Sequence, residues 1–170
     1  MTAVDLVVEE PAWLEALPDL ADIAERAAGM ALRALEDADP AYQICVMACG
    51  DDRIADLNAE FRGKPVPTNV LSWPAFDLAP TMPGGAPAKP PPAPVPGEPV
   101  FLGDVAIALQ VVMREADAAS LPLKTHATHL ILHACLHLLG YDHETPEDAG
   151  LMEAFETRSM IEAGFDDPYA

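Results

Sequence analysis

The sequence is short of basic residues, and this shortage argues against one broad class of nucleic-acid-binding proteins. Its 170 residues include nine Lys and Arg but 28 Asp and Glu, which gives a formal net charge of −19. Proteins that bind nucleic acid non-specifically need a basic face, because attraction to the phosphates supplies most of their affinity. A nucleic-acid function of this chain would therefore require a local cationic spot or a partner that delivers the substrate.

Cysteine pairs and long apolar runs are also lacking. The three cysteines, Cys45, Cys49 and Cys135, form no CxxC pair, so we interpret them as small buried apolar residues that stay reduced. No apolar run reaches the roughly 18 residues that span a bilayer. The N-terminal stretch has neither the basic nor the apolar region of a signal peptide. We therefore expect a cytoplasmic protein with no membrane segment.

What the sequence does contain is the pattern of a globular domain, with 51% hydrophobic and 22% charged residues. Short stretches rich in valine, isoleucine and aromatic residues predict four strands, at 4–10, 42–48, 68–74 and 101–109. Apolar residues at three- and four-residue steps predict helices at 11–37 (interrupted near Pro18), 51–63, 110–119, 123–140 and 145–164. This alternation predicts a single α/β (α+β) domain over residues 1–170, with helices packed on one sheet.

The helix expected at 51–63 has recognisable signals at both ends. An aspartate comes before its first apolar residue, and a glycine follows the last one. We expect Asp51 to be the N-cap and Gly63 to end the helix. The spacing of Ile54, Leu57 and Phe61 predicts that these three side chains face the core.

Residues 78–100 differ in kind from the rest of the chain. Nine of the eighteen prolines fall between Pro80 and Pro99. Proline removes backbone donors, and the segment has few large apolar side chains, so it is expected to form neither a sheet strand nor a packed helix. We predict a flexible surface insertion with polyproline II character. The alternative is a ligand for a module that recognises proline-rich peptides.

The histidines of the stretch "HLILHACLHLLGYDH" (129–143) have the spacing of a metal site. His133 and His137 are four residues apart on a predicted helix, so both imidazoles lie on one face. Gly140 can adopt the left-handed conformation that ends a helix, which would bring His143 back as a third ligand. Three histidines leave one tetrahedral position open, as in catalytic rather than structural zinc sites. The pattern suits zinc, although nickel, copper or iron could also be bound.

Other polar residues near this motif allow more than one interpretation. His126 and His129 continue the stripe upstream, and we interpret them as core, capping or second-shell residues. Asp142 could hold the free ring nitrogen of a ligand histidine, or it could be a turn residue. The HxxxHxxGxxH spacing is that of a group of zinc peptidases, but these have a catalytic glutamate where this chain has Ala134. Peptide hydrolysis needs that proton carrier, whereas RNA cleavage can use the internal 2′-hydroxyl.

A cation near the metal would suit phosphodiester chemistry, and the sequence offers one candidate. Arg62 and Lys64 are the only closely spaced pair among the nine Lys and Arg. The guanidinium of Arg62 presents a fork that matches phosphate geometry. By charge alone, however, a solvated surface position is the simpler interpretation of Arg62.

At these residues the chain resembles the YbeY family of bacterial rRNA maturation factors. The stretch "HACLHLLGYDH" (133–143) is similar to the signature of that family, and "LNAEFRGKPVPTNVLSWP" (57–74) is similar to its LNxxFRGKDxPTDVLSFP segment. The stretches "LGDVAIA" (102–108) and "MEAFE" (152–156) resemble LGDIxIS and MExxE. The chain departs from the family at Pro65, at Ala134 and in the length of the proline-rich segment.

The resemblance implies a fold, an activity and a set of site residues. The implied fold is a mixed sheet of about four strands covered by helices, with the metal-binding helix along a cleft. The implied ligands of one Zn²⁺ are His133, His137 and His143, and Arg62 is the implied catalytic residue. The implied activity is a single-strand-specific, metal-dependent endoribonuclease that acts in 3′-end maturation of small-subunit (16S) rRNA and in ribosome quality control. Ribosomal proteins and a ribosome-assembly GTPase are the implied partners.

The sequence leaves open the nucleophile, the general base and two alternative functions. The nucleophile is either a water on the metal or a 2′-hydroxyl, and Asp104 and Asp142 are candidate general bases. The first alternative to a nuclease is a non-enzymatic ribosome-assembly factor with a structural metal, which the net charge favours. The second is a metallopeptidase-like zinc hydrolase, which the histidine spacing suggests and Ala134 disfavours.

Overall fold

The computed structural model describes residues 2–36 and 41–170 as one four-stranded sheet with helices on both faces. The strands are β1 (Thr2–Val8), β2 (Tyr42–Cys49), β3 (Val70–Pro74) and β4 (Val100–Ala108). Their order is β1-β2-β4-β3, with β1, β2 and β4 parallel and β3 antiparallel to β4. The mixed sheet of four strands that the resemblance implied is therefore confirmed.

The helices follow the predicted order. They are α1 (Ala12–Ala16), α2 (Leu20–Leu32), α3 (Asp51–Arg62), α4 (Leu109–Ala118), α5 (Leu123–Leu138) and α6 (Pro146–Glu162), with a 3₁₀ turn η1 (Arg33–Leu35) after α2. The expected interruption near Pro18 is confirmed, since residues 17–19 separate α1 from α2. The predicted end of this helical region at Asp37 lies outside the described residues. None of the described helices is both long enough and apolar enough to cross a bilayer.

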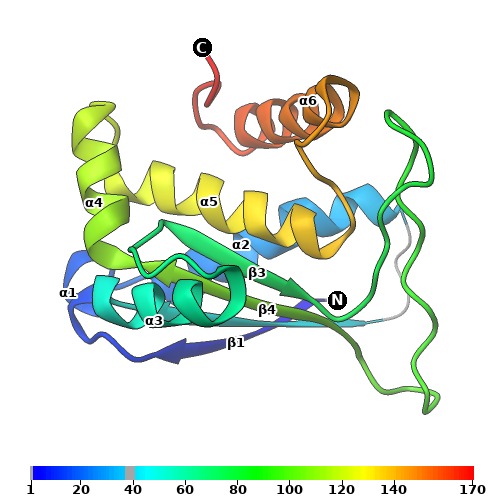
Figure 1. Ribbon diagram of the computed structural model, residues 1–170, viewed down its shortest axis with the longest axis horizontal. Helices are drawn as coiled ribbons and strands as arrows, with labels where there is room; N and C mark the ends of the chain where they lie inside the picture. Colours follow the sequence, from blue (N-terminus) through cyan, green and yellow to red (C-terminus); the bar gives the residue numbers. More distant parts are fainter. Residues whose placement is uncertain (1, 37–40) are drawn as a thin grey trace.

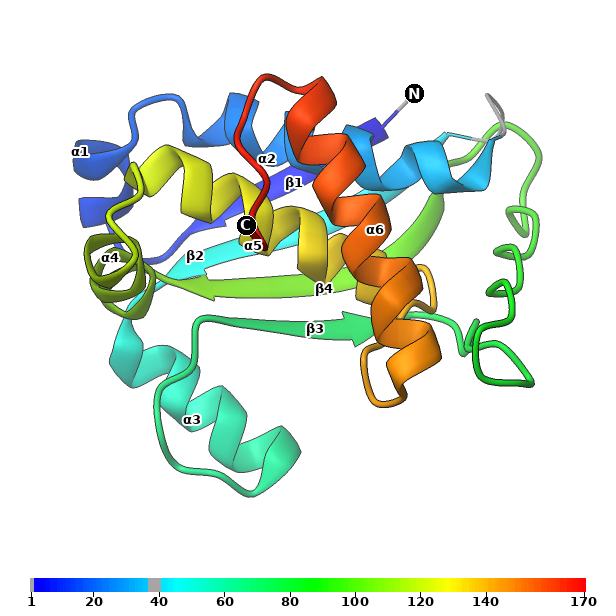
Figure 2. The same ribbon diagram turned by 90° about the horizontal axis from the view of Figure 1, so that it is seen from above.

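The main core lies between the sheet and the helices α2 and α5, which cover one face with α6 stacked on α5 (Figures 1 and 2). The largest fully buried side chains of this layer are Trp13, Leu20, Ile44, Leu102, Ile107, Ile131, Leu132, Leu136, Leu138 and Leu139. A smaller cluster joins α3 to the opposite face, around Ile54, Leu57 and Leu71. Helix α5 is apolar on most of its circumference because it packs against the sheet and three other helices.

Two expectations for α3 are wrong. The N-cap is Gly50, not Asp51, because the two helices α3 and α4 cap each other. The Asp51 amide donates to Gln110 Oε1 (3.0 Å), and the Asp51 carboxylate accepts from the Val111 amide in the first turn of α4 (3.0 Å). Phe61 is 57% exposed instead of buried, and its ring stands edge-on to Trp73 at the rim of the sheet (5.1 Å between centroids).

The proline-rich segment 78–100 forms no helix and reaches strand conformation only at Val100, where β4 begins. It extends from one end of the molecule (Figures 1 and 2). The Gly84 amide donates to Asp148 in the first turn of α6 (2.9 Å), and Leu78 is buried. The segment is therefore attached at its start, while its flexibility and polyproline II character stay predictions.

Helix α5 ends in a glycine turn that also holds the start of this segment. Gly140 has a φ of 92°, and the amides of Gly140 and Tyr141 donate back to the carbonyls of His137 and Leu136 (both 3.1 Å). This is the Schellman arrangement that closes many helices. A Cβ on Gly140 would lie 2.5 Å from the Leu78 carbonyl oxygen, so only glycine allows the Leu78 backbone to pack here.

We predict that Gly140→Ala lowers the free energy of unfolding by about 1–3 kcal/mol, because alanine is strained at this φ and collides with Leu78. The matched control is Gly150→Ala in the exposed interior of α6, where nothing lies within 4 Å of the added Cβ. That change should raise stability by up to about 1 kcal/mol, because alanine is the better helix former. Urea unfolding of both variants measures the difference, and effects of the same sign would contradict this account of Gly140.

Candidate metal centre and its cleft

The structure brings the three histidines of the motif together at the C-terminal end of α5. His133 and His137 project from successive turns of the helix, and the turn at Gly140 returns the chain so that His143 faces them. The ring centroids are 4.6 Å apart for His133 and His137, 5.4 Å for His133 and His143, and 5.2 Å for His137 and His143. One nitrogen from each ring lies within 4.8 Å of the others, so the cluster could hold one metal ion.

In His133 and His137, hydrogen bonds to the outer ring nitrogen determine which nitrogen faces the cluster without a proton. His137 Nδ1 lies 2.9 Å from the Tyr141 carbonyl oxygen, which can only accept, so Nδ1 must carry the proton. His133 Nδ1 lies 2.5 Å from Oε1 of Glu156, which imposes the same tautomer while the carboxylate is ionised. In the neutral form of each of these two rings, the Nε2 atom is then left with a free lone pair.

The Nε2 atoms of His133 and His137 face each other and lie 3.1 Å apart. Burial and the neighbouring His133 ring lower the pKa of His137 from 6.5 to about 4, so this ring is neutral near pH 7. When neither Nε2 atom carries a proton, the two nitrogens repel each other unless a cation is placed where both can bind it. Two ligands of a tetrahedral zinc at about 2.1 Å would stand about 3.4 Å apart, so the observed donor set fits such an ion.

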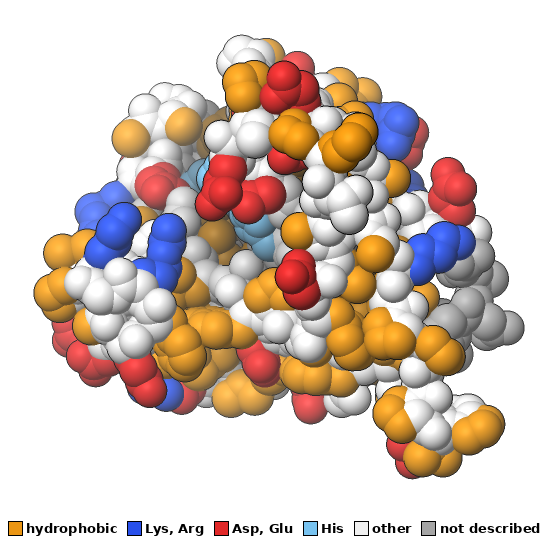
Figure 3. All heavy atoms as spheres, turned by 45° about the vertical axis from the view of Figure 1, so that its right-hand side comes forward, with side chains coloured by type: hydrophobic (Ala, Val, Ile, Leu, Met, Phe, Trp, Pro, Cys, Tyr) orange, Lys and Arg blue, Asp and Glu red, His pale blue; other side chains and the backbone are white. Residues whose placement is uncertain are grey.

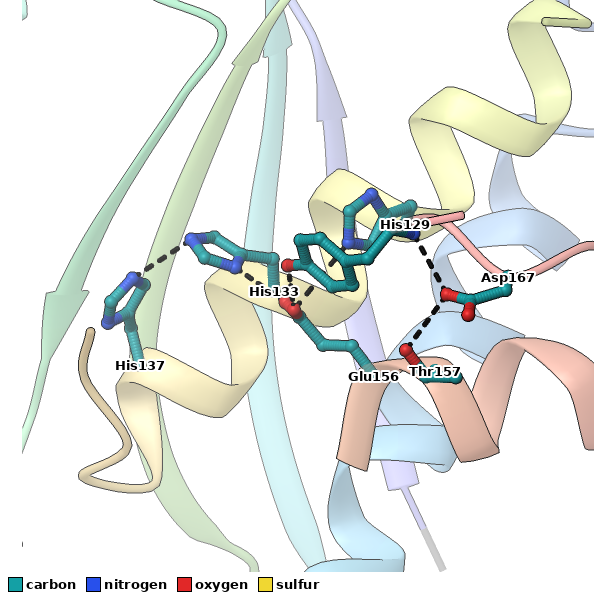
Figure 4. A network of polar contacts seen from close by, with 7 residues as sticks. His129, His133, His137, Glu156, Thr157 and Asp167 are labelled. Carbon is teal, nitrogen blue, oxygen red and sulfur yellow. Dashed lines mark hydrogen bonds and ion pairs between the residues drawn. The ribbon is translucent and has the colours of Figure 1, made fainter. Parts of the chain in front are cut away.

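Glu156 contacts His133 at Nδ1, on the side of the ring that faces away from the other two histidines (Figure 4). The sequence pattern alone did not predict this contact. Its side chain is fully buried in α6, where it contacts His133 and accepts a hydrogen bond from the hydroxyl of Tyr169 near the C-terminus. His129 Nε2 lies 3.7 Å from the same carboxylate, too far for a hydrogen bond, and it is buried without another hydrogen-bond partner. The glutamate of "MEAFE" matched the resemblance, but only helix packing shows what it touches.

The buried carboxylate of Glu156 stays ionised because of these neighbours. Burial by itself would raise its pKa, but the ring nitrogens of His129 and His133 and the Tyr169 hydroxyl lower it from 4.5 to about 2. Burial and the carboxylate in turn raise the pKa of Tyr169, which therefore stays protonated and donates. A carboxylate behind a ligand imidazole fixes its tautomer and strengthens its lone pair.

The histidine cluster opens into a cleft of about 520 Å³. One wall is formed by residues 68–72 at the start of β3 and by Arg62 at the end of α3, and the other by α5 and Tyr169. Figure 3 shows histidine side chains recessed in a hollow, with Lys and Arg side chains on one side and Asp and Glu side chains on another. Arg62 is the only Lys or Arg that lines this cleft within the described ranges.

Arg62 and Lys64 are also the two cations without a partner. Four of the nine Lys and Arg side chains form ion pairs (Arg33, Arg53, Arg114 and Lys124), Arg26 and Arg158 lie over phenylalanine rings, and Lys89 is engaged as well. Over residues 2–36 and 41–170, no hydrogen bond, ion pair or ring contact involves the side chain of Arg62 or Lys64. Both are exposed. Both are therefore free to meet an anionic ligand, and Arg62 can do so at the cleft.

The remaining candidates lie elsewhere or have other partners. Asp104 is exposed beside Cys45 on the sheet face opposite α5 and does not line the cleft, so it is wrong as a general base. Cys45 is only half-buried, contrary to expectation. Among the described residues, no hydrogen bond joins the Asp142 carboxylate to a ring nitrogen. It accepts from the His143 amide (2.8 Å), and Asp142 lines the cleft. His126 pairs with Glu115 (2.7 Å).

Comparison with known proteins gives consistent matches over nearly the whole chain. Residues 15–164 match the sequence model of the family described as Endoribonuclease YbeY. Proteins of that name from Ruegeria pomeroyi and Paracoccus denitrificans are 52% and 48% identical; each alignment covers 98% of this chain, and 97% and 89% of those proteins. The solution structure of a Thermotoga maritima protein aligns with a TM-score of 0.55 at 18% identity, over 95% of this chain and 92% of that one. This last likeness shows a shared fold.

The position of Glu156 predicts a specific effect on metal affinity. Glu156→Gln should weaken zinc binding by about 10- to 100-fold, because the amide is a poorer acceptor for His133 Nδ1. Competition with a chromogenic chelator measures the dissociation constant. The control is Glu153→Gln, which removes an exposed charge from the same helix. Equal affinities for the two variants would show that Glu156 does not support the ligand.

The lowered pKa of His137 predicts how the metal-free protein responds to acid. The ring protonates near pH 6.5 in the unfolded chain but only near pH 4 in the folded one, so the unfolded state binds more protons between these values. The contribution of His137 to stability is therefore complete above about pH 6.5 and lost as the pH falls towards 4. Unfolding of chelator-treated protein across this range should show a smaller loss for His137→Asn than for the wild type. Parallel curves would contradict the pKa assignment.

Proposed function

Because the chain belongs to the YbeY endoribonuclease family, we propose that it is a metal-dependent endoribonuclease that cleaves single-stranded RNA. In this proposal residues 1–170 act as one cytoplasmic domain with an insertion at 78–100. The substrate is the 3′ region of small-subunit (16S) rRNA, and the cleavage serves rRNA maturation and ribosome quality control. Ribosomal proteins and a ribosome-assembly GTPase are the proposed partners, and they would deliver RNA to a protein whose net charge is −19.

The proposal rests on one observation, which is that the histidine cluster and Arg62 line the same cleft. Three histidines whose ring nitrogens lie within 4.8 Å of one another share that cleft with an arginine that has no partner among the described residues. A phosphodiester presents a charged oxygen to both kinds of group at once. Neutral peptide substrates would make little use of Arg62, so the charge arrangement favours a phosphate ester.

Each residue has a defined part in this proposal. His133, His137 and His143 hold one zinc ion, which when bound polarises a phosphate oxygen and lowers the pKa of an attacking water. Glu156 and the Tyr141 carbonyl orient the first two rings. Arg62 binds the scissile phosphate and stabilises the charge that develops on it. Its position at the end of α3 places its side chain at the cleft wall, opposite α5.

The position of Ala134 supports RNA rather than peptide as substrate. Ala134 lines the cleft and its side chain can neither accept nor donate a proton. Cleavage of a peptide requires proton delivery to a poor leaving group, whereas RNA carries a 2′-hydroxyl beside each phosphate.

The net charge of −19 favours a second candidate function. In this alternative the protein is a ribosome-assembly factor that uses its metal to brace α5 and does not cut RNA.

We predict that Arg62→Ala lowers kcat/KM for a single-stranded rRNA fragment by about 10²- to 10³-fold. The reason is that the phosphate loses the one Lys or Arg that lines the cleft in the described part of the chain. Zinc content should stay at one ion per chain, whereas His137→Ala should lose both zinc and cleavage. Arg33→Ala is the matched control, since Arg33 pairs with Glu162 on the surface and does not line the cleft.

Cleavage is followed by gel, and the metal is measured by elemental analysis of the same preparations. Cleavage that is equal in all four proteins would indicate a contaminating nuclease. The absence of cleavage in the wild type, with zinc bound, would favour the assembly-factor alternative.

A further inference from the structure

A second hollow adjoins the metal cleft and has different chemistry. It measures about 410 Å³ and shares Ser72, His137 and Asp142 with the first cleft. It lies where the chain leaves β3 and enters the proline-rich segment, against the glycine turn that ends α5. Its size falls within the range of small-ligand sites in proteins.

The lining of this hollow does not suit a phosphate. No Lys or Arg lines it within the described residues, while the carboxylates of Asp77 and Asp142 do. One oxygen of each carboxylate accepts a backbone amide, from Ala79 (3.3 Å) and His143 (2.8 Å) respectively. Within residues 2–36 and 41–170, the second oxygen of each carboxylate makes no side-chain hydrogen bond or ion pair. Two such acceptors repel phosphate but can receive amino groups.

The hollow also offers aromatic surface. Phe76 and Tyr141 are among the residues that line it, and both are half-buried. Aromatic side chains next to a backbone-binding cleft are the usual means by which proteins hold unstacked bases of single strands. The contact between Leu78 and Gly140 fixes the wall of the hollow, because the Leu78 backbone packs where no Cβ would fit.

We propose that this hollow is a nucleobase subsite, which holds the base of a nucleotide next to the scissile phosphate. Phe76 and Tyr141 provide ring surface for stacking, and Asp77 and Asp142 accept hydrogen bonds from an exocyclic amino group. Adenine, cytosine and guanine carry such a group and uracil does not. This inference rests on the proposed RNA cleavage and adds a preference for the base beside the cut.

The experiment uses the zinc-loaded protein and a short single-stranded RNA with one mapped cleavage site. The nucleotides on the two sides of the cut are replaced in turn by an abasic residue or by each of the four bases. On the side of the cut whose base enters the hollow, the abasic residue should lower kcat/KM by about 10- to 100-fold. Among the four bases at that position, uracil should give the lowest kcat/KM.

Two variants assign the effect to the hollow. Phe76→Leu keeps apolar volume but removes the ring, and it should bring the ratio between the normal and the abasic substrate close to one. Asp77→Asn, an exposed change, should reduce the discrimination between uracil and the amino-bearing bases. The control is Phe101→Leu, an exposed aromatic residue of β4 outside both hollows, which should preserve the ratio.

The outcomes separate the subsite from the proposed function. If the wild type cuts every oligonucleotide at the same rate, whichever flanking base is removed, the subsite is wrong and the nuclease proposal stands. If base removal matters but Phe76→Leu and Asp77→Asn behave like Phe101→Leu, the base binds elsewhere. If no oligonucleotide is cut, the proposed function fails and the subsite fails with it.

Discussion

The site depends on how α5 ends. The left-handed Gly140 closes the helix, and the same turn sets the Tyr141 carbonyl against His137, returns His143 to the cluster and forms a wall of the second hollow. Because the Leu78 backbone packs directly on Gly140, the start of the proline-rich segment is held at the same point. The backbone conformation of Gly140 thus determines where the histidines lie, which tautomer His137 adopts and what shape the cleft has. A residue with a side chain larger than hydrogen does not fit at this position.

A second constraint is the buried carboxylate of Glu156. An ionised group inside a core is costly unless its oxygens are satisfied, and here His133 and the Tyr169 hydroxyl supply the partners. This contact joins α6 and the C-terminal residues to the face of α5 that carries His133 and His137. The same polar pair therefore contributes to the packing of the last helix and to the orientation of a ligand ring.

The distribution of charge explains how so acidic a chain could still receive RNA. Most of its Lys and Arg side chains have carboxylate or ring partners in the protein, and these can contribute little to phosphate binding. The exposed Arg62 and Lys64 have no such partner among the residues that the structure describes, and Arg62 lines the histidine cleft. A local pair of cations can guide a phosphate at short range, because screening by salt limits the repulsion from distant carboxylates. Non-specific binding to RNA would still be weak, which fits delivery by a partner.

The sequence by itself determined the succession of strands and helices along the chain and the interruption near Pro18. It also determined that two histidines share one face of a helix and that a third follows the turn at its end. These follow from local rules, since periodicity, proline and glycine act over a few residues. Only the tertiary structure decided that Asp51 caps α4, that Phe61 lies at the rim, that Asp104 faces away from the cleft and that Glu156 supports His133. Such contacts join residues far apart in the chain, and no local pattern specifies which of many compatible side chains will meet across a packed interface.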